Sequence, residues 1–176
     1  MTDPIRRAER VHLRFPSEDD RPAFARAWMA SAELHDPWLD PEEPGHAFDR
    51  LLDRNRGESD RSLMVIREED GALAGMYNIS QIFRGGFQNA YLGYAAFEPL
   101  AGQGYMRDAM PLLVAYAFED LRLHRLQANV QPGNARSIAL LRATGWREEG
   151  FAPRYLRIRG DWRDHLLFAI TAEDVT

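Results

Sequence analysis

Two glycines in three residues, Gly102 and Gly104, stand directly before an apolar run with helical periodicity. This spacing predicts a tight turn that ends a strand and opens a helix. The first amides of a helix have no partners within it and lie at the positive end of its dipole, so they can bind a phosphate group. A dinucleotide fingerprint would need glycine where Arg107 stands, and a P-loop would need a lysine, which the chain lacks. The glycines could also simply form a tight turn.

The elements that must position this turn follow from hydrophobic periodicity. Ser17 with Asp20 predicts a capping box for the first helix. Helices are expected over 17 to about 32, about 46 to 56, about 105 to 121, and after Pro132. Strands are expected at 11–15, 62–68, 73–83, 87–97 and 124–130, with a final hairpin within 154–170. Three prolines argue against a helix across 33–45. The order predicts an α+β protein with a mostly antiparallel sheet.

Composition narrows the class of protein. With 176 residues and 45% hydrophobic content, the chain can bury one core, so a single domain over 1–176 is expected. No run reaches transmembrane length and the N-terminus lacks a secretory apolar segment, which predicts a cytoplasmic protein without a membrane partner. The absence of cysteine excludes disulfides, thiolate zinc sites and an enzyme thiol nucleophile.

Charge and histidine spacing remove two further classes. The net charge of −5 does not favour a nucleic-acid partner, which would normally need a dominant basic face. The five histidines are scattered, with no H-x-x-x-H spacing, so no metal is expected.

Several motifs together resemble a known superfamily. The sequence "GQGYM" at 102–106, the N-x-x-S pair Asn134 and Ser137, and "TGW" at 144–146 resemble the GNAT superfamily of acetyl-CoA-dependent N-acetyltransferases. The sequences "DPW" at 36–38, "HR" at 124–125 and "GDWRDH" at 160–165 are similar to those of the ribosomal-protein-alanine N-acetyltransferases, the RimJ/RimL branch. The resemblance covers nearly the whole chain.

The resemblance implies a GNAT fold: one mixed, mostly antiparallel sheet with a splayed central strand pair and about four flanking helices. It implies acetyl-CoA as cosubstrate, with the pyrophosphate on the helix-opening amides and the pantetheine arm along the splayed strand. The family pattern Q/R-x-x-G-x-G/A falls on Ala101, Gly104 and Met106, so its first and last positions differ here. The implied coenzyme-binding residues are Tyr94, Ala95, Ala96, Phe97, Gly102, Gln103, Gly104, Tyr105, Met106, Arg107, Asn134 and Ser137. Arg107 could instead be simply solvated, and Tyr94 to Phe97 could be ordinary sheet.

The resemblance also locates candidate catalytic groups. The tyrosine acid common in the superfamily falls on Leu141, which has no proton to donate, so Ser137 is expected to assist the departing thiolate. Ser137 could instead bond its own helix backbone. The glutamate base of some relatives falls near Asn129, which can orient an amine but cannot take its proton. Because a free α-amine has a pKa near ~8 and a lysine near ~10.4, the missing base favours an α-amine substrate. Glu33, His35 or Asp164 could still act through water.

Three residues are expected to contact the acceptor. His35 and Trp38 lie in the proline-rich segment, and Asp164 lies in the final hairpin. Each has a simpler alternative: His35 exposed and inert, Trp38 a core anchor, and Asp164 paired with Arg163 or Arg159.

These observations predict an N-acetyltransferase that passes acetyl directly to an amine, with a protein N-terminus as the preferred acceptor and a monomer or homodimer as the assembly. A small amine such as an amino acid, polyamine or antibiotic is the alternative acceptor. A non-catalytic acyl-CoA-binding module also stays open because of Ala101, Asn129 and Leu141. A generic α+β domain without coenzyme would show no stabilisation by coenzyme A.

Overall fold

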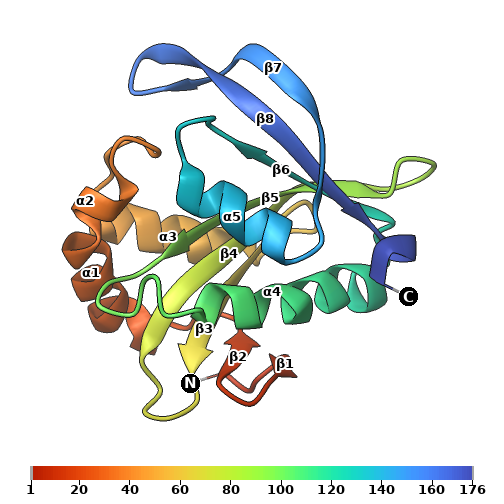
Figure 1. The fold of residues 1–176 in the computed structure, drawn as a ribbon. Helices are drawn as coiled ribbons and strands as arrows, with labels where there is room; N and C mark the ends of the chain where they lie inside the picture. The colour runs from red at the N-terminus through yellow and green to blue at the C-terminus, as the bar shows by residue number, and fades with distance from the viewer. Residues whose placement is uncertain (1, 176) are drawn as a thin grey trace.

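The computed structural model of the protein describes residues 2–175 and is built on one mixed sheet (Figure 1). Its strands lie in the order β1-β2-β3-β4-β5-β6-β8-β7. All neighbours are antiparallel except β5 and β6. The strands are β1 (Arg6–Arg7), β2 (Val11–Arg14), β3 (Arg61–Arg67), β4 (Leu73–Phe83), β5 (Asn89–Ala96), β6 (Arg125–Val130), β7 (Arg147–Ile158) and β8 (Asp161–Thr171). The predicted α+β class with a mostly antiparallel mixed sheet is confirmed.

Five α-helices accompany this sheet in the described residues, one more than expected. They are α1 (Arg21–Ala30), α2 (Ala32–His35), α3 (Pro44–Arg54), α4 (Tyr105–Ala115) and α5 (Ala135–Ala143). The additional helix, α2, is a single turn inside the segment that its prolines were expected to keep irregular. Pro44 opens α3, because a first-turn proline loses no helical hydrogen bond.

The helix boundaries reflect local chemistry. Ser17 and Asp20 form the predicted capping box on a 3-10 turn, Glu18–Asp20, which leads directly into α1. The helix expected over 105–121 is regular only to Ala115 and continues as a π-helical turn, Tyr116–Asp120.

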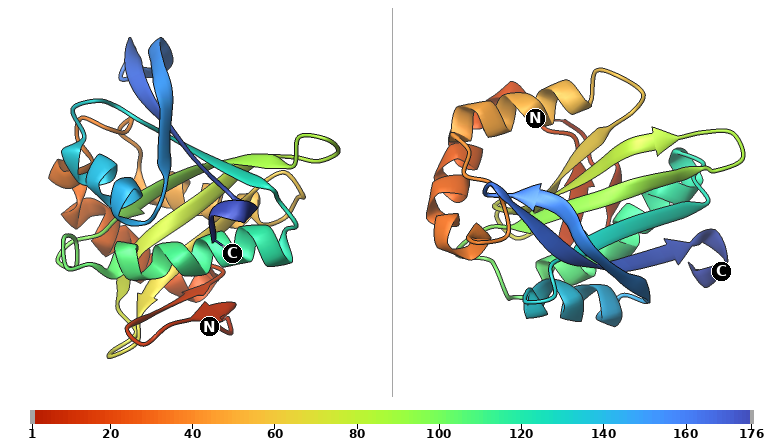
Figure 2. Two further views of the ribbon diagram at one scale, coloured as in Figure 1. Left: turned by 45° about the vertical axis from the view of Figure 1, so that its right-hand side comes forward. Right: turned by 90° about the horizontal axis from the view of Figure 1, so that it is seen from above.

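The helices cover the two faces of the sheet separately (Figures 1 and 2). Neighbouring strand residues point to opposite faces. Accordingly Met76 and Ala95 pack with the aromatic residues of α1 and α3, whereas Tyr77 and Tyr94 pack with α4 and the C-terminal half of the chain. The sheet therefore separates two apolar layers, and α4 packs in the second one.

The central parallel pair is splayed. β5 and β6 pair only through Asn89–Tyr91 and Arg125–Gln127, and the strands separate beyond these residues. The hairpin of β7 and β8 extends beyond the sheet toward the segment after α2 (Figure 1). The predicted splayed pair is therefore present, and a hairpin arches over it.

Candidate active site

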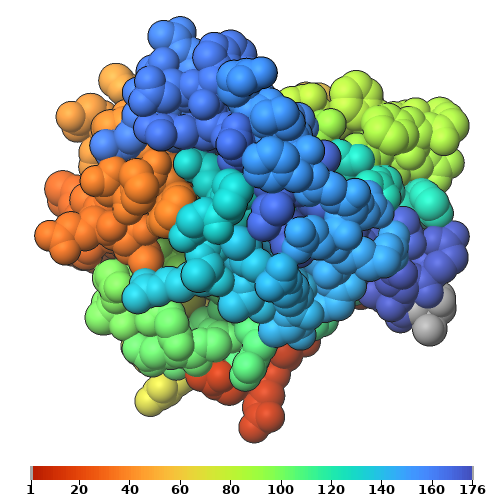
Figure 3. All heavy atoms as spheres, turned by 45° about the horizontal axis from the view of Figure 1, so that its top comes forward, coloured from red at the N-terminus to blue at the C-terminus, as the bar shows by residue number. Residues whose placement is uncertain are grey.

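A cleft of about 750 Å³ occupies the opening between β5 and β6. The N-terminus of α4, the first turns of α5, the segment after α2 and the β7–β8 hairpin line it. On one face of the molecule, the orange atoms near α2, the green atoms of the turn before α4 and the teal atoms of α5 border one another (Figure 3). Elements distant in sequence therefore meet around this cleft.

The β5 backbone presents unpaired polar groups to the cleft. The C=O of Gln88 accepts from the N–H of Arg125 on β6, whereas the N–H of Phe97 donates to the C=O of Ala74 on β4. The N–H and C=O groups of successive strand residues point toward opposite neighbouring strands. Those of the even-numbered β5 residues therefore point toward β6. Beyond the Tyr91–Gln127 pair, the N–H and C=O of Tyr94 and the N–H of Ala96 therefore face the opening without a partner strand. They can receive an extended ligand as an added strand would.

The turn before α4 leaves several backbone amides unpaired. Gly104, the N-cap residue, adopts a φ of 89°, a value that favours glycine, and no side chain within residues 2–175 caps the helix. The first helical bond runs from the N–H of Asp108 to Gly104, so the amides of Tyr105, Met106 and Arg107 remain available. A side chain at Gly104 would meet guanidinium nitrogens of Arg10 at 3.6 Å and Arg107 at 3.8 Å. Free amides, the helix dipole and the Arg107 guanidinium thus converge there, whereas Arg10 is paired with the carboxylate of Asp108 at 2.6 Å.

Close backbone packing fixes this turn against the sheet. The hydroxyl of Tyr77 donates to the C=O of Met106 at 2.6 Å and is fully buried. A Cβ atom at Gly75 would collide with the sulfur of Met106 and lie 2.6 Å from the C=O of Ala95. The turn before α4 therefore lies beside the Ala96 end of β5, since Gly75 pairs with Ala96.

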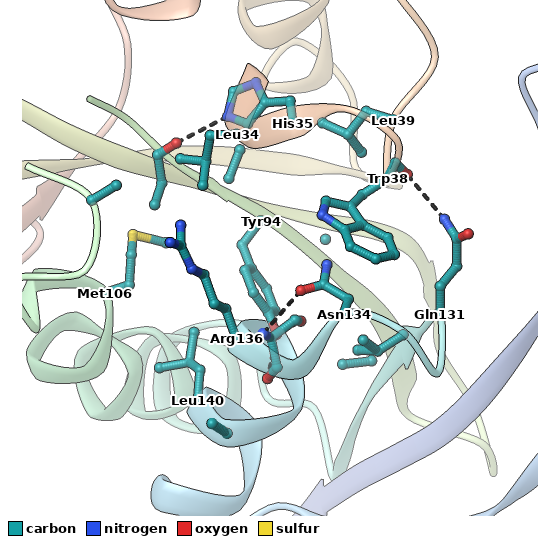
Figure 4. A pocket seen from close by; sticks show the side chains of 18 of the residues that line it. Leu34, His35, Trp38, Leu39, Tyr94, Met106, Gln131, Asn134, Arg136 and Leu140 are labelled. Carbon is teal, nitrogen blue, oxygen red and sulfur yellow. Dashed lines mark hydrogen bonds between the residues drawn. The ribbon is translucent and has the colours of Figure 1, made fainter. Parts of the chain in front are cut away.

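A tyrosine and a serine meet at the centre of the cleft. The hydroxyl of Tyr94 lies 2.6 Å from Oγ of Ser137 on α5. Burial raises the pKa of Tyr94 to about 12, although the bond to Ser137 opposes the shift. The N–H of Ser137 donates to Oδ1 of Asn134, the N-cap residue, at 3.1 Å (Figure 4). The helix cap therefore uses the serine amide, and the hydroxyl is bonded to Tyr94.

Asn129 on β6 and His165 on β8 line the opposite side of the cleft, and Tyr155 on β7 contacts both. Nδ2 of Asn129 donates to the hydroxyl of Tyr155 at 3.2 Å, and the Tyr155 ring lies 5.6 Å from the ring of His165. His165 is 2% exposed and lines the cleft. Sequence reasoning noted the motif ending at His165 and assigned that histidine no role.

The expected acceptor residues are only partly brought together. His35 and Trp38 line the cleft, and Nε2 of His35 donates to the C=O of Ala96 at 2.9 Å (Figure 4). Burial lowers the pKa of His35. Asp164 does not line the cleft, and its carboxylate accepts from the backbone N–H of Arg154 at 2.7 Å. Neither Arg163 nor Arg159 pairs with Asp164 among the described contacts.

The remaining predicted residues divide in the same way. Phe97 and Gln103 do not line the cleft: the Phe97 side chain is fully buried, and the Gln103 side chain donates to the C=O of Pro99 at 2.8 Å. The predicted residues that do line it are Tyr94, Ala95, Ala96, Gly102, Gly104, Tyr105, Met106, Arg107, Asn129, Asn134 and Ser137. Arg136, which the sequence did not single out, extends from α5 into the cleft (Figure 4).

The hairpin turn closes over the cleft through one arginine. The guanidinium of Arg159 contacts the carboxylate of Asp36 at 2.8 Å and donates to the C=O of Leu39 at 3.1 Å. The backbone N–H of Arg159 donates to the carboxylate of Asp40. These contacts join the segment after α2 to the hairpin across the mouth of the cleft.

Within residues 2–175, no group of three or more histidine, aspartate or glutamate side chains is arranged to hold a metal ion. No helix in this part of the chain is both long and apolar enough to cross a lipid bilayer.

Comparison with known proteins adds a family and several relatives. The acetyltransferase (GNAT) domain model matches residues 10–147. The ribosomal protein uS5-alanine N-acetyltransferase of Escherichia coli (strain K12) is 39% identical over 61% of this chain and 56% of the relative. The Bacillus subtilis (strain 168) protein named "Probable N-acetyltransferase YjcK" is 38% identical over 62% of this chain and 61% of the relative. Each alignment thus spans less than two thirds of the relative's length.

A solved structure matches over a longer range. Mycobacterium smegmatis RimJ, in complex with CoA-disulfide, superimposes with a TM-score of 0.85 and 30% sequence identity. The match covers 94% of this chain and 83% of that protein.

Proposed function

Because the chain belongs to the GNAT acetyltransferase family, we propose that it transfers acetyl from acetyl-CoA to the N-terminal α-amine of a protein or peptide. The observation that carries the proposal is the continuity of two backbone features. The free amides of α4 lie beside the Ala96 end of β5, and the unpaired groups of Tyr94 and Ala96 follow along the opening. An anionic group on an extended arm fits both features.

The proposed coenzyme contacts follow from this geometry. The amides of Tyr105, Met106 and Arg107 hold the pyrophosphate, and the Arg107 and Arg136 side chains supply charge. The backbone of Tyr94 and Ala96 binds the pantetheine arm. Acetyl-CoA supplies a thioester carbonyl, and a backbone N–H directed at its oxygen stabilises the charge that develops during attack.

The Tyr94–Ser137 pair is the proposed proton source for the departing thiolate. Its hydroxyls lie 2.6 Å apart at the cleft centre. Because burial raises the pKa of Tyr94 to about 12, the pair stays protonated at neutral pH. Leu141 is fully buried in the core, so Ser137 takes the place that a tyrosine on α5 would otherwise fill.

Two arguments support an α-amine acceptor. Asn129 lines the cleft with its amide nitrogen held by Tyr155, so its oxygen remains free to accept from an ammonium group. An α-amine has an ordinary pKa near ~8, so it loses a proton more readily than lysine. The E. coli relative carries a ribosomal-protein-alanine acetyltransferase name, which agrees with this acceptor class.

A small amine is the second candidate, and one observation favours it. The contacts of Arg159 with Asp36 and Leu39 join the two sides of the cleft mouth. A mouth closed in this way restricts entry more for a peptide than for a small amine.

Mass spectrometry of acceptor peptides tests the proposal. Peptides with free Ala or Ser N-termini are compared with N-blocked peptides that carry an internal lysine. Acetylation of the free N-termini alone supports the proposal. Acetylation of the lysine, or of a small-amine panel only, contradicts it.

Coenzyme binding is tested separately by thermal unfolding. At coenzyme A concentrations 100 times the Kd, a folded-state ligand adds about 2.7 kcal/mol of stability. Stabilisation without acetylation of any amine would indicate a binding module.

A further inference from the structure

We propose that His165 is the general base that removes a proton from the acceptor ammonium. The inference rests on the proposed function, since it concerns the same cleft and reaction. It assigns a role to a buried cleft residue that the family resemblance left without one.

The hydrogen bonding of His165 fixes its tautomer. Nδ1 lies 3.0 Å from the C=O of Arg163. A carbonyl oxygen only accepts, so Nδ1 carries the hydrogen and Nε2 of the neutral ring carries the lone pair. No described residue hydrogen-bonds to Nε2, and the ring lines the cleft. The one basic atom of this side chain is therefore the atom left available.

The surroundings keep the ring neutral. Burial lowers the pKa of His165, while the bond to Arg163 and the charge of Asp164 oppose the shift. Asp164 is itself bonded to the amide of Arg154 on β7. From β7 the ring faces Tyr155, and from β6 the amide of Asn129 lies nearby. The cleft also contains His35, Glu98, Tyr94, Arg107 and Arg136.

Strand register places His165 beside Asn129. Asn129 pairs with Leu167, and residues two apart on a strand share a face, so His165 and Asn129 face the same side. Diagonal neighbours of this kind lie roughly 7–8 Å apart. One ammonium group fits between them, bonded to the oxygen of Asn129 and to Nε2 of His165.

In the proposed step, Nε2 of His165 takes one proton from the acceptor ammonium. The lone pair left on the amine nitrogen then forms a bond to the thioester carbonyl carbon. The C–S bond breaks when the carbonyl reforms. The sulfur takes a proton from the Ser137–Tyr94 hydroxyl pair. The amine nitrogen loses its second proton, and this proton returns to the same hydroxyl pair. The products are an amide, the coenzyme thiol and one proton, which His165 releases to solvent.

His35 is the rival base in the same cleft. Its Nε2 donates to the C=O of Ala96, so its Nδ1 carries the lone pair. Its ring packs against Trp28 and Phe97 with centroid distances of 5.2 and 5.8 Å. Since Ala96 lies at the end of β5 beside α4, His35 is adjacent to the proposed pyrophosphate end. His165 lies beside Asn129, nearer the point where the strands join.

The first test does not use activity. Long-range ¹H–¹⁵N NMR of the free protein reports the tautomer and the charge of each histidine ring. The expected result is a neutral His165 ring at pH 7 with hydrogen on Nδ1 and titration below the ordinary value near ~6.5. An Nε2–H tautomer or a charged ring at pH 7 would overturn the proposal, whatever the acceptor proves to be.

The second test compares pH profiles of kcat/KM for an acetylated amine. The variant His165→Gln is expected to lose about 10²-fold or more at pH 7. The deficit should shrink above pH 8, where the amine is already neutral. His124→Gln is the matched control, because His124 is exposed and bonded to Glu173 away from the cleft.

Two outcomes of this comparison overturn the proposal. One is a deficit of His165→Gln that is the same at every pH, which would indicate a structural role. The other is a deficit that depends on pH in His35→Gln but not in His165→Gln. If wild type acetylates no amine at all, the proposed function fails, and the NMR result still decides the ionisation argument.

Discussion

The hydroxyls of Tyr94 and Ser137 lie 2.6 Å apart, although the residues are 43 positions apart in the chain. Tyr94 belongs to β5 and Ser137 to the first turn of α5, so the contact joins the splayed strand to the helix below it. The pair forms a single hydrogen-bonded unit at the cleft centre, and its two members should act together.

Replacing Tyr94 by phenylalanine tests this unit. Tyr94→Phe should lower kcat about 10- to 100-fold, since a hydrogen bond to a charged group contributes about 1.5–3 kcal/mol. The Kd for coenzyme A should not change, because the backbone groups remain. Steady-state kinetics and calorimetric titration measure the two quantities.

The double variant Tyr94→Phe with Ser137→Ala is the sharper comparison. Because both hydroxyls serve one network, the loss in kcat of the double variant, expressed as a free energy, should be smaller than the sum of the losses of the two single variants. Full additivity would argue against a shared proton source. Tyr116→Phe, which alters a core tyrosine that does not line the cleft, serves as the control.

Gly75 should be intolerant of a side chain. In Gly75→Ala, the added methyl group would meet the sulfur of Met106 and the C=O of Ala95. Overpacking of this kind lowers the free energy of unfolding by about 1–3 kcal/mol, and displacement of Met106 should also weaken coenzyme binding. Gly86→Ala is the control, since nothing lies within 4 Å of the added atom. Equal stability of the two variants in urea would contradict the expected clash.

Arg159 should govern access of the acceptor. Arg159→Ala removes the contacts with Asp36 and the C=O of Leu39, so the acceptor KM should change severalfold while the Kd for coenzyme A stays constant. Arg157→Ala, in the same hairpin, contacts only the turn at Gly160 among the described hydrogen bonds and should keep the wild-type KM. Identical kinetics for both variants would mean that the hairpin contact does not limit entry.

The pair of Arg14 and Asp20 should make a pH-dependent contribution to stability. Their side chains are 6% and 12% exposed, with nitrogen–oxygen distances of 2.6 and 2.7 Å. Burial alone would raise the pKa of Asp20, but the bonds from Arg14 and from the N–H of Ser17 hold it below its ordinary value. Breaking a buried pair costs about 3–5 kcal/mol, so Asp20→Ala should be strongly destabilised at pH 7.

The sign of the pH effect follows from the lowered pKa of Asp20. Its contribution is fully present above the unfolded value near ~3.9 and is lost as the pH falls through the folded value. Urea unfolding at pH 7 and pH 3 should therefore show a smaller acid loss in Asp20→Ala than in wild type. Glu18→Gln, on an exposed pair with Arg21, should resemble wild type at both values.

Local features of the fold and of the site could be predicted from sequence. The turn around Gly104, the cap formed by Ser17 and Asp20, and the helix start at Asn134 each depend on a few consecutive residues. Such signals are complete within a short segment, so these turns and helix starts followed from residue types.

Features that depend on which face of the sheet a side chain occupies, or on packing between distant segments, could not be predicted from the sequence. Asp164 was expected in the cleft, whereas its neighbour His165 lines it, because a shift of one residue reverses the face of a strand. The role of the Tyr94 side chain was also missed, since its contact requires α5 to dock against β5. The ion pair of Arg159 with Asp36 joins two loops, and no local sequence pattern encodes their relative positions.

The splayed opening separates recognition from reactivity within one residue. The main chain of Tyr94 faces the opening between β5 and β6, while its side chain contacts Ser137 on α5. A ligand held by peptide groups is insensitive to the identity of the side chain that carries them. In the proposed binding mode, substitution at this position can therefore change its proton chemistry while the backbone still binds the coenzyme arm.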